Sequence, residues 1–272
     1  MAALPMSHQV FSILSSLVRE RAGLHFEASH APIFAEKVAA RATEAGFESL
    51  LDYYYFLRYD AAAAPELDRL IDALVVNETY LLRELSPLEV AVDALQAQVA
   101  SGGRRPRVWC AACATGDEPL TLAMLLAQRG LLTEVELVAS DISGQALERA
   151  RTGRLGRRAI RGELAPSFSR WLTIRDRDVT IDERLVRAVT WHRINLIDDA
   201  AVMALGTFDF IFCRNVLIYF SDETARRVVD RLAARLVPGG ALFVGISESL
   251  LRLGTSLRCE ELNGVFLYRK VS

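Results

Sequence analysis

Two hydrophobic patterns divide the chain. Over roughly the first 100 residues, apolar side chains recur at the three- and four-residue spacings of a helix, as in Leu14, Leu17 and Val18, and no alternating run marks a strand. Gly23 and Gly46 each follow such a stretch, at the position where glycine commonly ends a helix. This part of the chain is therefore predicted to be entirely helical.

The spacing of apolar residues changes after residues 101–106, a polar, glycine-rich stretch that is typical of a linker. Short apolar runs follow at 108–111, 135–139, 208–212 and 241–245, and helical stretches separate most of them. Runs that are apolar on both faces and alternate with helices predict a parallel sheet covered on each side. The second part is therefore predicted to be a doubly wound α/β domain.

The alternation of strands and helices lapses between residues 153 and 192. Thr173–Ile174, Val179–Ile181 and Leu185–Val186 are short strand candidates with charged residues between them. We expect them to form a small antiparallel excursion from the main sheet.

Composition narrows the class of protein. The chain has 272 residues, 51% of them hydrophobic and 24% charged, which is typical of a globular protein with a sizeable core. Its formal net charge is −2, so we expect no general basic field that attracts nucleic acid, and any basic binding surface must be local.

Residues 1–10 contain no basic or apolar leader, and no apolar run reaches the ~18 residues of a membrane span. We therefore expect a cytoplasmic protein without membrane insertion.

The four cysteines are Cys110, Cys113, Cys213 and Cys259, and most of them lie in or beside apolar runs. Buried, reduced thiols are the favoured interpretation. The C-x-x-C spacing of Cys110 and Cys113 also suggests a redox or zinc site. No second ligand pair follows at the spacing of a metal site, so no metal is expected.

The carboxyl ends of the predicted strands carry the candidate chemistry, because ligands of open parallel sheets bind there. After the first run, small residues lead into a helix whose first turn contains Asp117 and Glu118. These carboxylates suit the helix dipole but repel a pyrophosphate. Simple acidic capping of a helix gives the same pattern. The alternative is a ligand that is uncharged or cationic.

Asp141 follows the second run, where a carboxylate typically accepts hydrogen bonds from ribose hydroxyls, although it can also cap the next helix. Asn195 and Asn215 close two later strands and can either read an adenine edge or complete a turn. No G-x-G-x-x-G motif lies between the first two strand ends. The pattern therefore favours a nucleoside without a pyrophosphate, and S-adenosylmethionine fits that description.

Five blocks of the sequence carry a family resemblance. They are Asn77–Glu84 (N-E-T-Y-L-L-R-E), Ala112–Met124 (A-C-A-T-G-D-E-P-L-T-L-A-M), Phe208–Phe220 (F-D-F-I-F-C-R-N-V-L-I-Y-F), Pro238–Gly240 and Gly245–Ser249. In this order they resemble segments of the chemotaxis receptor methyltransferases, the CheR family of protein-glutamate O-methyltransferases, and the resemblance spans about residues 11–270. The departures from the family pattern are Leu81, Leu82, Asp117, Leu120 and Thr121.

The resemblance implies an S-adenosylmethionine cofactor and a set of site residues. Asn77, Thr79 and Arg83 are expected to reach the methionine end of the cofactor or the mouth of the active site. Arg83, Arg214 and Tyr219 are the candidate catalytic residues, with an arginine orienting the substrate carboxylate. The expected cofactor-binding residues are Asn77, Thr79, Arg83, Glu118, Asp141, Asn195, Leu196, Arg214 and Asn215.

The resemblance also implies domain boundaries. Residues 1–85 are expected to form a helical receptor-docking domain, and residues 86–106 a connecting helix and linker. Residues 107–272 are expected to form a Rossmann-like class I methyltransferase domain with a small β subdomain at about 155–190. In the family, the helical domain offers a basic face to the cytoplasmic helical bundle of methyl-accepting chemoreceptors. The matching residues are Lys37 and Arg41, with Arg19, Arg21, Arg58 and Arg69, which the sequence alone would leave as scattered surface charges.

The implied reaction is methyl transfer to glutamate side chains, for which little acid–base help is needed. A carboxylate with a reference pKa of ~4.3 is already an anion at neutral pH. The task of the protein is then to desolvate this anion and align it with the methyl group. The alternative function is a cofactor- or receptor-binding module with weakened turnover, which the altered positions permit. A methyltransferase acting on RNA or a small molecule is a further alternative, and the sequence does not name the receptor or the pathway.

Some members of the family bind a tethering peptide at the receptor C-terminus through a glycine-containing loop of the β subdomain. The equivalent turn here, Ile174–Val179, contains no glycine. A charged turn without glycine does not easily adopt positive φ angles. We therefore expect this protein to act without a C-terminal pentapeptide tether.

Overall fold

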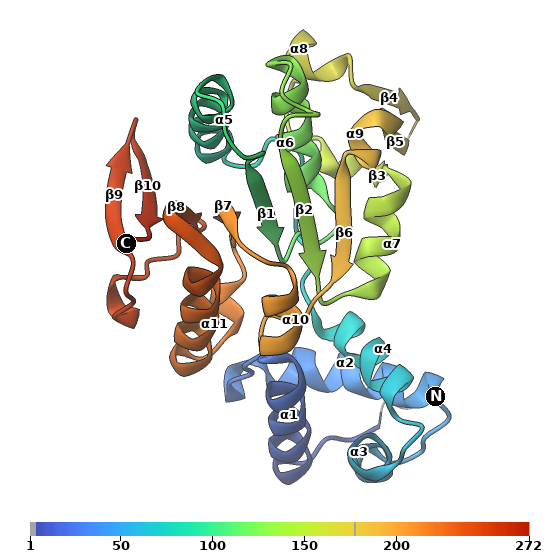
Figure 1. The fold of residues 1–272 in the computed structure, drawn as a ribbon. Coiled ribbons are helices and arrows are strands. Elements are labelled where there is room, and N and C mark those ends of the chain that lie inside the picture. Colours follow the sequence, from blue (N-terminus) through green and yellow to red (C-terminus); the bar gives the residue numbers. More distant parts are fainter. Residues whose placement is uncertain (1–3, 177, 272) are drawn as a thin grey trace. The chain divides into compact units, whose positions relative to one another are not determined.

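The computed structural model describes residues 4–176 and 178–271. The chain divides into two compact units (Figure 1). The helical unit comprises the residues up to Val76 together with Ile218–Thr224, and the sheet unit comprises Asn77–Leu217 and the residues from Ala225 onward. The division falls at Val76, whereas the sequence suggested residue 85.

The sheet unit is built on a seven-stranded sheet with the order β6-β2-β1-β7-β8-β10-β9. Strands β6, β2, β1, β7 and β8 run parallel, and β10 and β9 are antiparallel. This is the doubly wound arrangement that the sequence predicted, with an antiparallel edge added. The strands are β1 Arg107–Ala111, β2 Glu136–Asp141, β6 Val189–Arg193, β7 Phe208–Phe212, β8 Leu236–Phe243, β9 Arg258–Leu262 and β10 Val265–Arg269.

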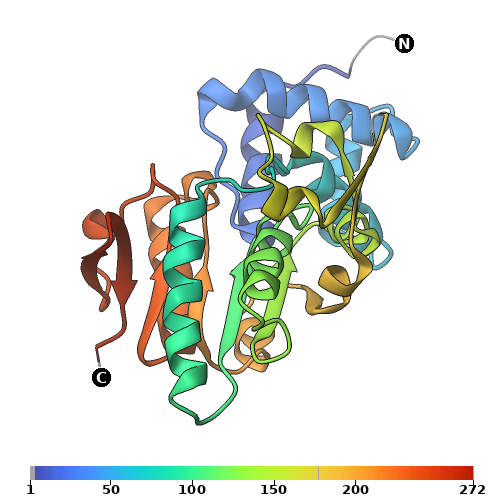
Figure 2. The same ribbon diagram turned by 90° about the horizontal axis from the view of Figure 1, so that it is seen from above.

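Helices pack against this sheet through alternate strand residues. Val108 and Cys110 of β1 belong to one buried cluster with α5 and α6, while Trp109 between them points to the opposite face. Figure 2 shows α5 in front of the strands. The helices are α5 Leu85–Ala100, α6 Asp117–Gln128, α7 Gly144–Thr152, α10 Asp199–Ala204 and α11 Asp222–Arg235.

The antiparallel β9–β10 hairpin was absent from the sequence prediction. Its turn is Asn263-Gly264, with φ angles of 52° and 77°, and Leu262 pairs with Val265. Asn-Gly is the dipeptide that most strongly favours a two-residue hairpin turn. This local signal was sufficient to find the hairpin.

The predicted small antiparallel sheet is present, with the order β3-β5-β4. A further strand was predicted at Leu185–Val186. This prediction is wrong, because these residues lie in the short helix α9 (Glu183–Arg187), which Asp182 caps. The argument from the glycine-free turn is also wrong, because Asp176 adopts a φ of 50°. Aspartate tolerates this conformation better than most residues. The elements are β3 Arg154–Gly156, η2 Arg157–Ala159, α8 Pro166–Ser169, β4 Leu172–Arg175 and β5 Asp178–Ile181.

The helical unit is helical, as the hydrophobic spacing predicted, with four α-helices among residues 4–76. Gly23 ends α1 at a φ of 77°, and Gly46 follows α2 at a φ of 86°. No helix among residues 4–176 and 178–271 is both long and apolar enough to cross a membrane. The helices are α1 His8–Ala22, α2 Ala31–Glu44, α3 Leu50–Tyr59 and α4 Ala64–Leu74, with the turns η1 Ala28–His30 and η3 Leu217–Tyr219.

A buried carboxylate joins three helices of this unit. Glu66 of α4 accepts hydrogen bonds from Arg41 of α2 at 2.6 and 3.1 Å and from the Tyr53 hydroxyl of α3 at 2.9 Å. Burial by itself raises the pKa of Glu66, but the hydrogen bonds from Arg41, Tyr53 and Arg69 outweigh it, so its pKa lies below the usual value. Burial and the contact with Glu66 raise the pKa of Tyr53, although Arg41 acts in the opposite direction. Arg41, predicted as part of a docking face, is therefore a structural residue.

Replacing Glu66→Leu is expected to destabilise the helical unit by about 3 kcal/mol, because it leaves the Tyr53 hydroxyl without its partner and the Arg41 charge with only the exposed Glu44. Hydrogen–deuterium exchange should accelerate in peptides of α2 and α4 while peptides of β1 and β7 stay unchanged. The lowered pKa means that the contribution of Glu66 is complete above pH 4.5 and is lost as the pH falls below it.

Glu44→Ala is the matched control, because Glu44 also pairs with Arg41 but its side chain is 68% exposed. Exposed pairs contribute about 0–1 kcal/mol, so exchange in the control should resemble that of the unchanged protein. Equal acceleration in both variants would contradict a special role for the buried carboxylate.

Candidate functional site

The site lies at the carboxyl edge of the parallel strands. β1 pairs with β2 on one side and with β7 on the other. The connection after β1 leads to β2 and the connection after β7 leads to β8, in opposite directions along the sheet, so a topological switch point lies between β1 and β7. Open α/β sheets bind ligands in the crevice outside such a point. Asp141 is the last residue of β2, and the other predicted residues lie just beyond strand ends at this edge: Asn195 after β6, and Arg214 and Asn215 after β7.

The loop after β1 has a strained backbone. Ala112 and Ala114 adopt φ angles of 57° and 49°, and Gly116 adopts 87° at the start of α6. A non-glycine residue in this region costs on the order of 1–3 kcal/mol and persists only where its surroundings hold it. The small side chains of this loop allow a ligand to approach the backbone closely.

Asp141 holds this loop in place. Its Oδ2 accepts from the Ala114 backbone at 2.8 Å, and its Oδ1 accepts from the Ser143 backbone at 2.8 Å. A carboxylate accepts more than two hydrogen bonds, so this geometry is compatible with further donors such as ribose hydroxyls. Asn195 follows the adjacent strand β6, where Ile194 donates to the Asp141 carbonyl oxygen, and Leu196 beside it is buried.

The segment of residues 77–84 carries Asn77, Thr79 and Arg83, and it is attached to α6. The Leu82 backbone donates to the Thr121 hydroxyl at 3.0 Å, and that hydroxyl donates to the Asp117 carbonyl oxygen at 2.7 Å. The threonine that departs from the family pattern thus keeps a hydroxyl at a point of attachment. Within the segment, Asn77 is exposed and Thr79 is half-buried.

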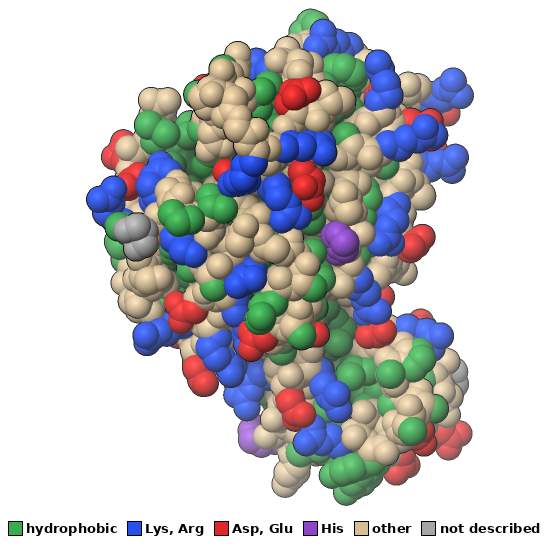
Figure 3. All heavy atoms as spheres, viewed as in Figure 1, with side chains coloured by type: hydrophobic (Ala, Val, Ile, Leu, Met, Phe, Trp, Pro, Cys, Tyr) green, Lys and Arg blue, Asp and Glu red, His purple; other side chains and the backbone are tan. Residues whose placement is uncertain are grey.

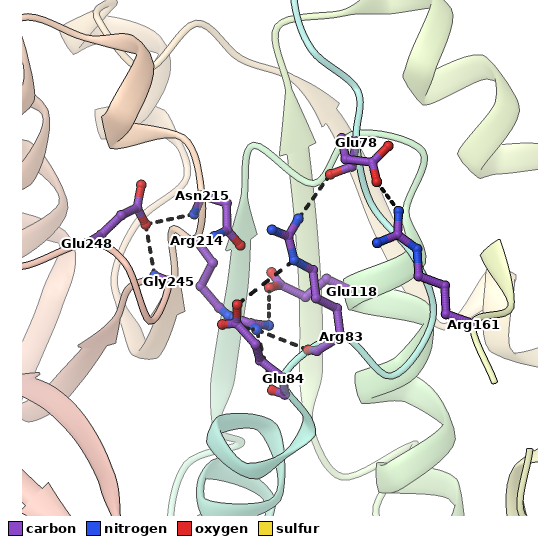
Figure 4. A network of polar contacts seen from close by, with 9 residues as sticks. All are labelled: Glu78, Arg83, Glu84, Glu118, Arg161, Arg214, Asn215, Gly245 and Glu248. Carbon is purple, nitrogen blue, oxygen red and sulfur yellow. Dashed lines mark hydrogen bonds and ion pairs between the residues drawn. The ribbon is translucent and has the colours of Figure 1, made fainter. Parts of the chain in front are cut away.

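Arg214 is the buried centre of an ion-pair cluster (Figure 4). Its guanidinium donates to Glu118 at 2.8 Å, to Glu84 at 2.8 Å and to the Arg83 carbonyl oxygen at 3.0 Å. Only 3% of its side chain is exposed. Burial would lower the pKa of Arg214, but Glu118 and Glu84 more than compensate, so the net shift is upward and the group stays charged. Glu118, which was predicted to bind the cofactor, is thus an ion-pair partner of Arg214.

Arg83 has a different environment from Arg214. Its Nη1 donates to the Glu78 carbonyl oxygen at 3.1 Å, and its Nε lies 4.0 Å from Glu84. Its guanidinium also lies 5.6 Å from the centre of the Tyr80 ring, and 26% of its side chain is exposed. These contacts leave donors of a planar fork available for a carboxylate.

Glu248 organises the loops after β7 and β8. Its Oε2 accepts from the backbones of Asn215 at 2.7 Å and Gly245 at 2.8 Å, and its Oε1 accepts from Leu217 at 2.8 Å. The Asn215 backbone has a φ of 58°, so this carboxylate stabilises a left-handed turn. Sequence reasoning gave Glu248 no role. The only signal for it was the Gly245–Ser249 block.

The remaining predicted positions fall into two groups. Tyr219 is the last residue of η3 and belongs to the helical unit, where its carbonyl oxygen accepts from the His25 backbone at 2.8 Å. Its catalytic role stays a prediction. Leu81 and Leu120, two departures from the family pattern, are buried in the core of the sheet unit. Their substitutions therefore concern packing.

The cysteines show no activated thiol at this edge. Burial raises the pKa of Cys110, Cys113 and Cys213 well above the usual value, with nearby carboxylates adding to the effect. A raised pKa keeps a thiol protonated and unreactive. Within residues 4–176 and 178–271, no cluster of three or more potential metal ligands is found.

These residues fit S-adenosylmethionine. The strained loop allows close approach, the Asp141 carboxylate is of a kind that accepts from ribose hydroxyls, and residues 112–118 contain no Lys or Arg that would favour phosphates. Asp117 at the start of α6 is buried; its Oδ2 accepts from the Thr115 hydroxyl at 2.6 Å, and its Oδ1 has no partner among the described residues. Acidic surroundings suit a ligand that carries sulfonium and ammonium charges.

Replacing Arg214→Met is expected to lower the free energy of unfolding of the sheet unit by about 3 kcal/mol, because Glu84 and Glu118 lose their shared counter-charge. All three tryptophans lie between residues 109 and 191, so their fluorescence reports this unit during urea unfolding. Arg151→Met is the control, since Arg151 forms an exposed pair with Glu148 and should cost about 0–1 kcal/mol. Equal shifts in both variants would contradict the role of Arg214.

A Gly245→Ala variant tests the loop that Glu248 holds. The added Cβ would lie 2.5 Å from Asn215 Nδ2 and 3.0 Å from Glu248 Oε2, so both side chains must move. Overpacking costs about 1–3 kcal/mol, and titration calorimetry should show roughly 5- to 150-fold weaker binding of S-adenosylhomocysteine. Gly156→Ala is the control, because its Cβ would meet no atom within 4 Å. Unchanged affinity in Gly245→Ala would remove this loop from the cofactor site.

Comparison with known protein families divides the chain into the same two parts as the structure. The family model described as "CheR methyltransferase, all-alpha domain" matches residues 9–75, and "CheR methyltransferase, SAM binding domain" matches residues 77–265. The boundary between the two matches coincides with the division of the structure into units.

Three relatives illustrate the range of similarity. The chain is 32% identical to chemotaxis protein methyltransferase 2 of Vibrio cholerae, covering 87% of this chain and 84% of that one. It is 32% identical to the chemotaxis protein methyltransferase of Vibrio parahaemolyticus, covering 99% of each. It is 34% identical to the probable biofilm formation methyltransferase WspC of Pseudomonas putida, covering 87% of this chain and 56% of that one. Both family matches and the extent of these similarities lead to one conclusion: the chain belongs to the CheR family of S-adenosylmethionine-dependent methyltransferases.

Proposed function

We propose that the protein transfers the methyl group of S-adenosylmethionine to glutamate side chains of methyl-accepting chemoreceptors and so forms methyl esters. Relatives named chemotaxis protein methyltransferase support this substrate class. The structural observation that carries the proposal is Arg83, a partly exposed guanidinium on a segment anchored beside the cofactor-binding strand ends. Such a group binds both oxygens of a carboxylate.

The two arginines have different tasks in this proposal. Arg214 has its terminal nitrogens bonded to Glu84, Glu118 and the Arg83 carbonyl oxygen, and only its buried Nε has no partner among the described residues. It is therefore the positioning residue, which holds the backbone of Arg83. Arg83 keeps donors for the substrate and is the candidate that contacts the carboxylate.

The reaction needs alignment more than proton transfer. When bound, the cofactor supplies a methyl group activated by a sulfonium. The glutamate arrives as an anion, so the protein must remove water from one carboxylate oxygen and hold it in line. Arg83 can fix the carboxylate plane, although a grip that is stronger in the ground state than in the transition state would slow the reaction. Held by Arg214, Arg83 can do this without reorganising its own backbone.

The direct test is transfer of a radiolabelled methyl group to the soluble cytoplasmic fragment of a chemoreceptor from the same genome. We expect labelled fragment whose label is released by mild alkali as methanol, as a carboxyl ester requires. Arg83→Gln should lower kcat/KM by about 10- to 150-fold, since losing a charged hydrogen bond costs roughly 1.5–3 kcal/mol, while the urea midpoint stays within error.

Label that survives alkali, or wild-type activity in Arg83→Gln, would contradict the proposal. The alternative of a cofactor- or receptor-binding module without turnover has no support in the comparisons. The expectation of docking without a C-terminal tether stays a prediction, and the geometry of the turn near Asp176 no longer supports it.

A further inference from the structure

The positive charge of the protein is concentrated in one segment. Residues 149–193 contain twelve arginines and five acidic side chains, although the whole chain has a net charge of −2. The chain up to residue 76, by contrast, contains six basic and ten acidic side chains. A local positive field therefore arises around the small antiparallel sheet. Figure 3 shows Lys and Arg side chains gathered over the region that Figure 1 labels α7, β4 and β5.

The pairing of the small sheet places part of this charge on one exposed face. Arg154 lies opposite Thr180, and both are exposed, whereas Leu155 and Val179 beside them form a buried pair. Successive residues of a strand point to opposite faces, so Arg154 lies on the solvent side. Arg157 and Arg158 follow directly in η2 and are also exposed.

Arg154, Arg157 and Arg158, which we call the β3–η2 arginines, have no acidic partner within residues 4–176 and 178–271. Their neighbours differ, because Arg184 pairs with Asp182 and Arg187 pairs with Glu183. The charge of the β3–η2 arginines is thus directed to solvent.

The same turn is attached to the segment that carries Arg83. The Leu81 backbone donates to the Ala159 carbonyl oxygen at 2.8 Å. Arg161 pairs with Glu78 and lies 4.0 Å above the Tyr80 ring (Figure 4 shows the ion pair). The β3–η2 arginines are therefore part of the same folded surface as the candidate carboxylate-binding residue.

We propose that the β3–η2 arginines dock acidic side chains that flank the methyl-accepting glutamate on the substrate helix. This inference rests on the proposed function, because a substrate rich in glutamate complements their charge. Four of the six basic residues among residues 4–76 are engaged within the helical unit. Arg41 and Arg69 pair with Glu66, Arg58 pairs with Glu20, and Lys37 donates to the Leu74 carbonyl oxygen at 3.4 Å.

The test is the paired change Arg157→Glu and Arg158→Glu in the full chain, with the cytoplasmic receptor fragment as substrate. We expect KM to rise ~10-fold or more at low ionic strength, with kcat and S-adenosylhomocysteine affinity unchanged, because rim charges act on encounter and docking. The difference should shrink at ~0.5 M salt, where the Debye length is about 4 Å. A fragment whose flanking glutamates are changed to glutamine should not distinguish the variant from the unchanged protein.

The matched control is Arg226→Glu with Arg227→Glu, an adjacent exposed pair on α11 of the same unit. An equal rise of KM in this control, or no rise in the Arg157–Arg158 variant, overturns the inference. Binding of the unchanged protein to phosphatidylglycerol vesicles or RNA that the variant loses, with KM on the fragment unaltered, overturns it too, in favour of a lipid or nucleic-acid surface.

Fragment binding measured by fluorescence anisotropy separates this inference from the proposed function. If the unchanged protein transfers no methyl group, the proposed function fails, yet weaker fragment binding by the Arg157–Arg158 variant alone still supports the docking surface. If transfer occurs and the variant binds the fragment normally, the docking surface fails alone.

Discussion

The buried guanidinium of Arg214 is the interaction on which the rest of the site depends. It joins the end of β7, the first turn of α6 and the segment that leads into α5, through Glu118 and Glu84. Removing one charge from such a cluster leaves the others desolvated and unpaired, which costs more than any surface ion pair contributes. The position of the segment carrying Arg83 therefore follows from charge neutralisation, even though Arg83 itself is partly exposed.

Two carboxylates have the same task for the loops that follow the neighbouring strands β1 and β7. Asp141 holds the strained alanine loop after β1, and Glu248 holds the left-handed turn at Asn215. In both places the acid accepts from backbone N–H groups that would otherwise be buried without partners. The backbone strain at the ligand edge is thus balanced by hydrogen bonds from outside the loops. This arrangement fixes a site before any ligand binds, which reduces the ordering that binding requires.

The charges of the protein are divided between structure and surface. In the helical unit, the buried carboxylate of Glu66 accepts hydrogen bonds from Arg41 and Arg69, so these two arginines stabilise the packing of helices. In the small sheet, the β3–η2 arginines have no such partner within the described residues. Only the second kind of charge can act on another molecule without a cost to the fold, because nothing inside the protein has to give up its contact.

The sequence by itself determined the fold class, the two-part organisation and the strand ends that bear Asp141, Asn195 and Asn215. These features depend on local periodicity and on the rule that parallel strands end at one edge. Tertiary structure alone decided which charges meet: Arg214 finds Glu118 and Glu84, 96 and 130 residues away in the chain. It also decided that Leu185–Val186 is helical and that Glu248 serves the site. Pairing over such separations is set by topology and burial, because a one-dimensional pattern gives the character of each residue but not its neighbours in space.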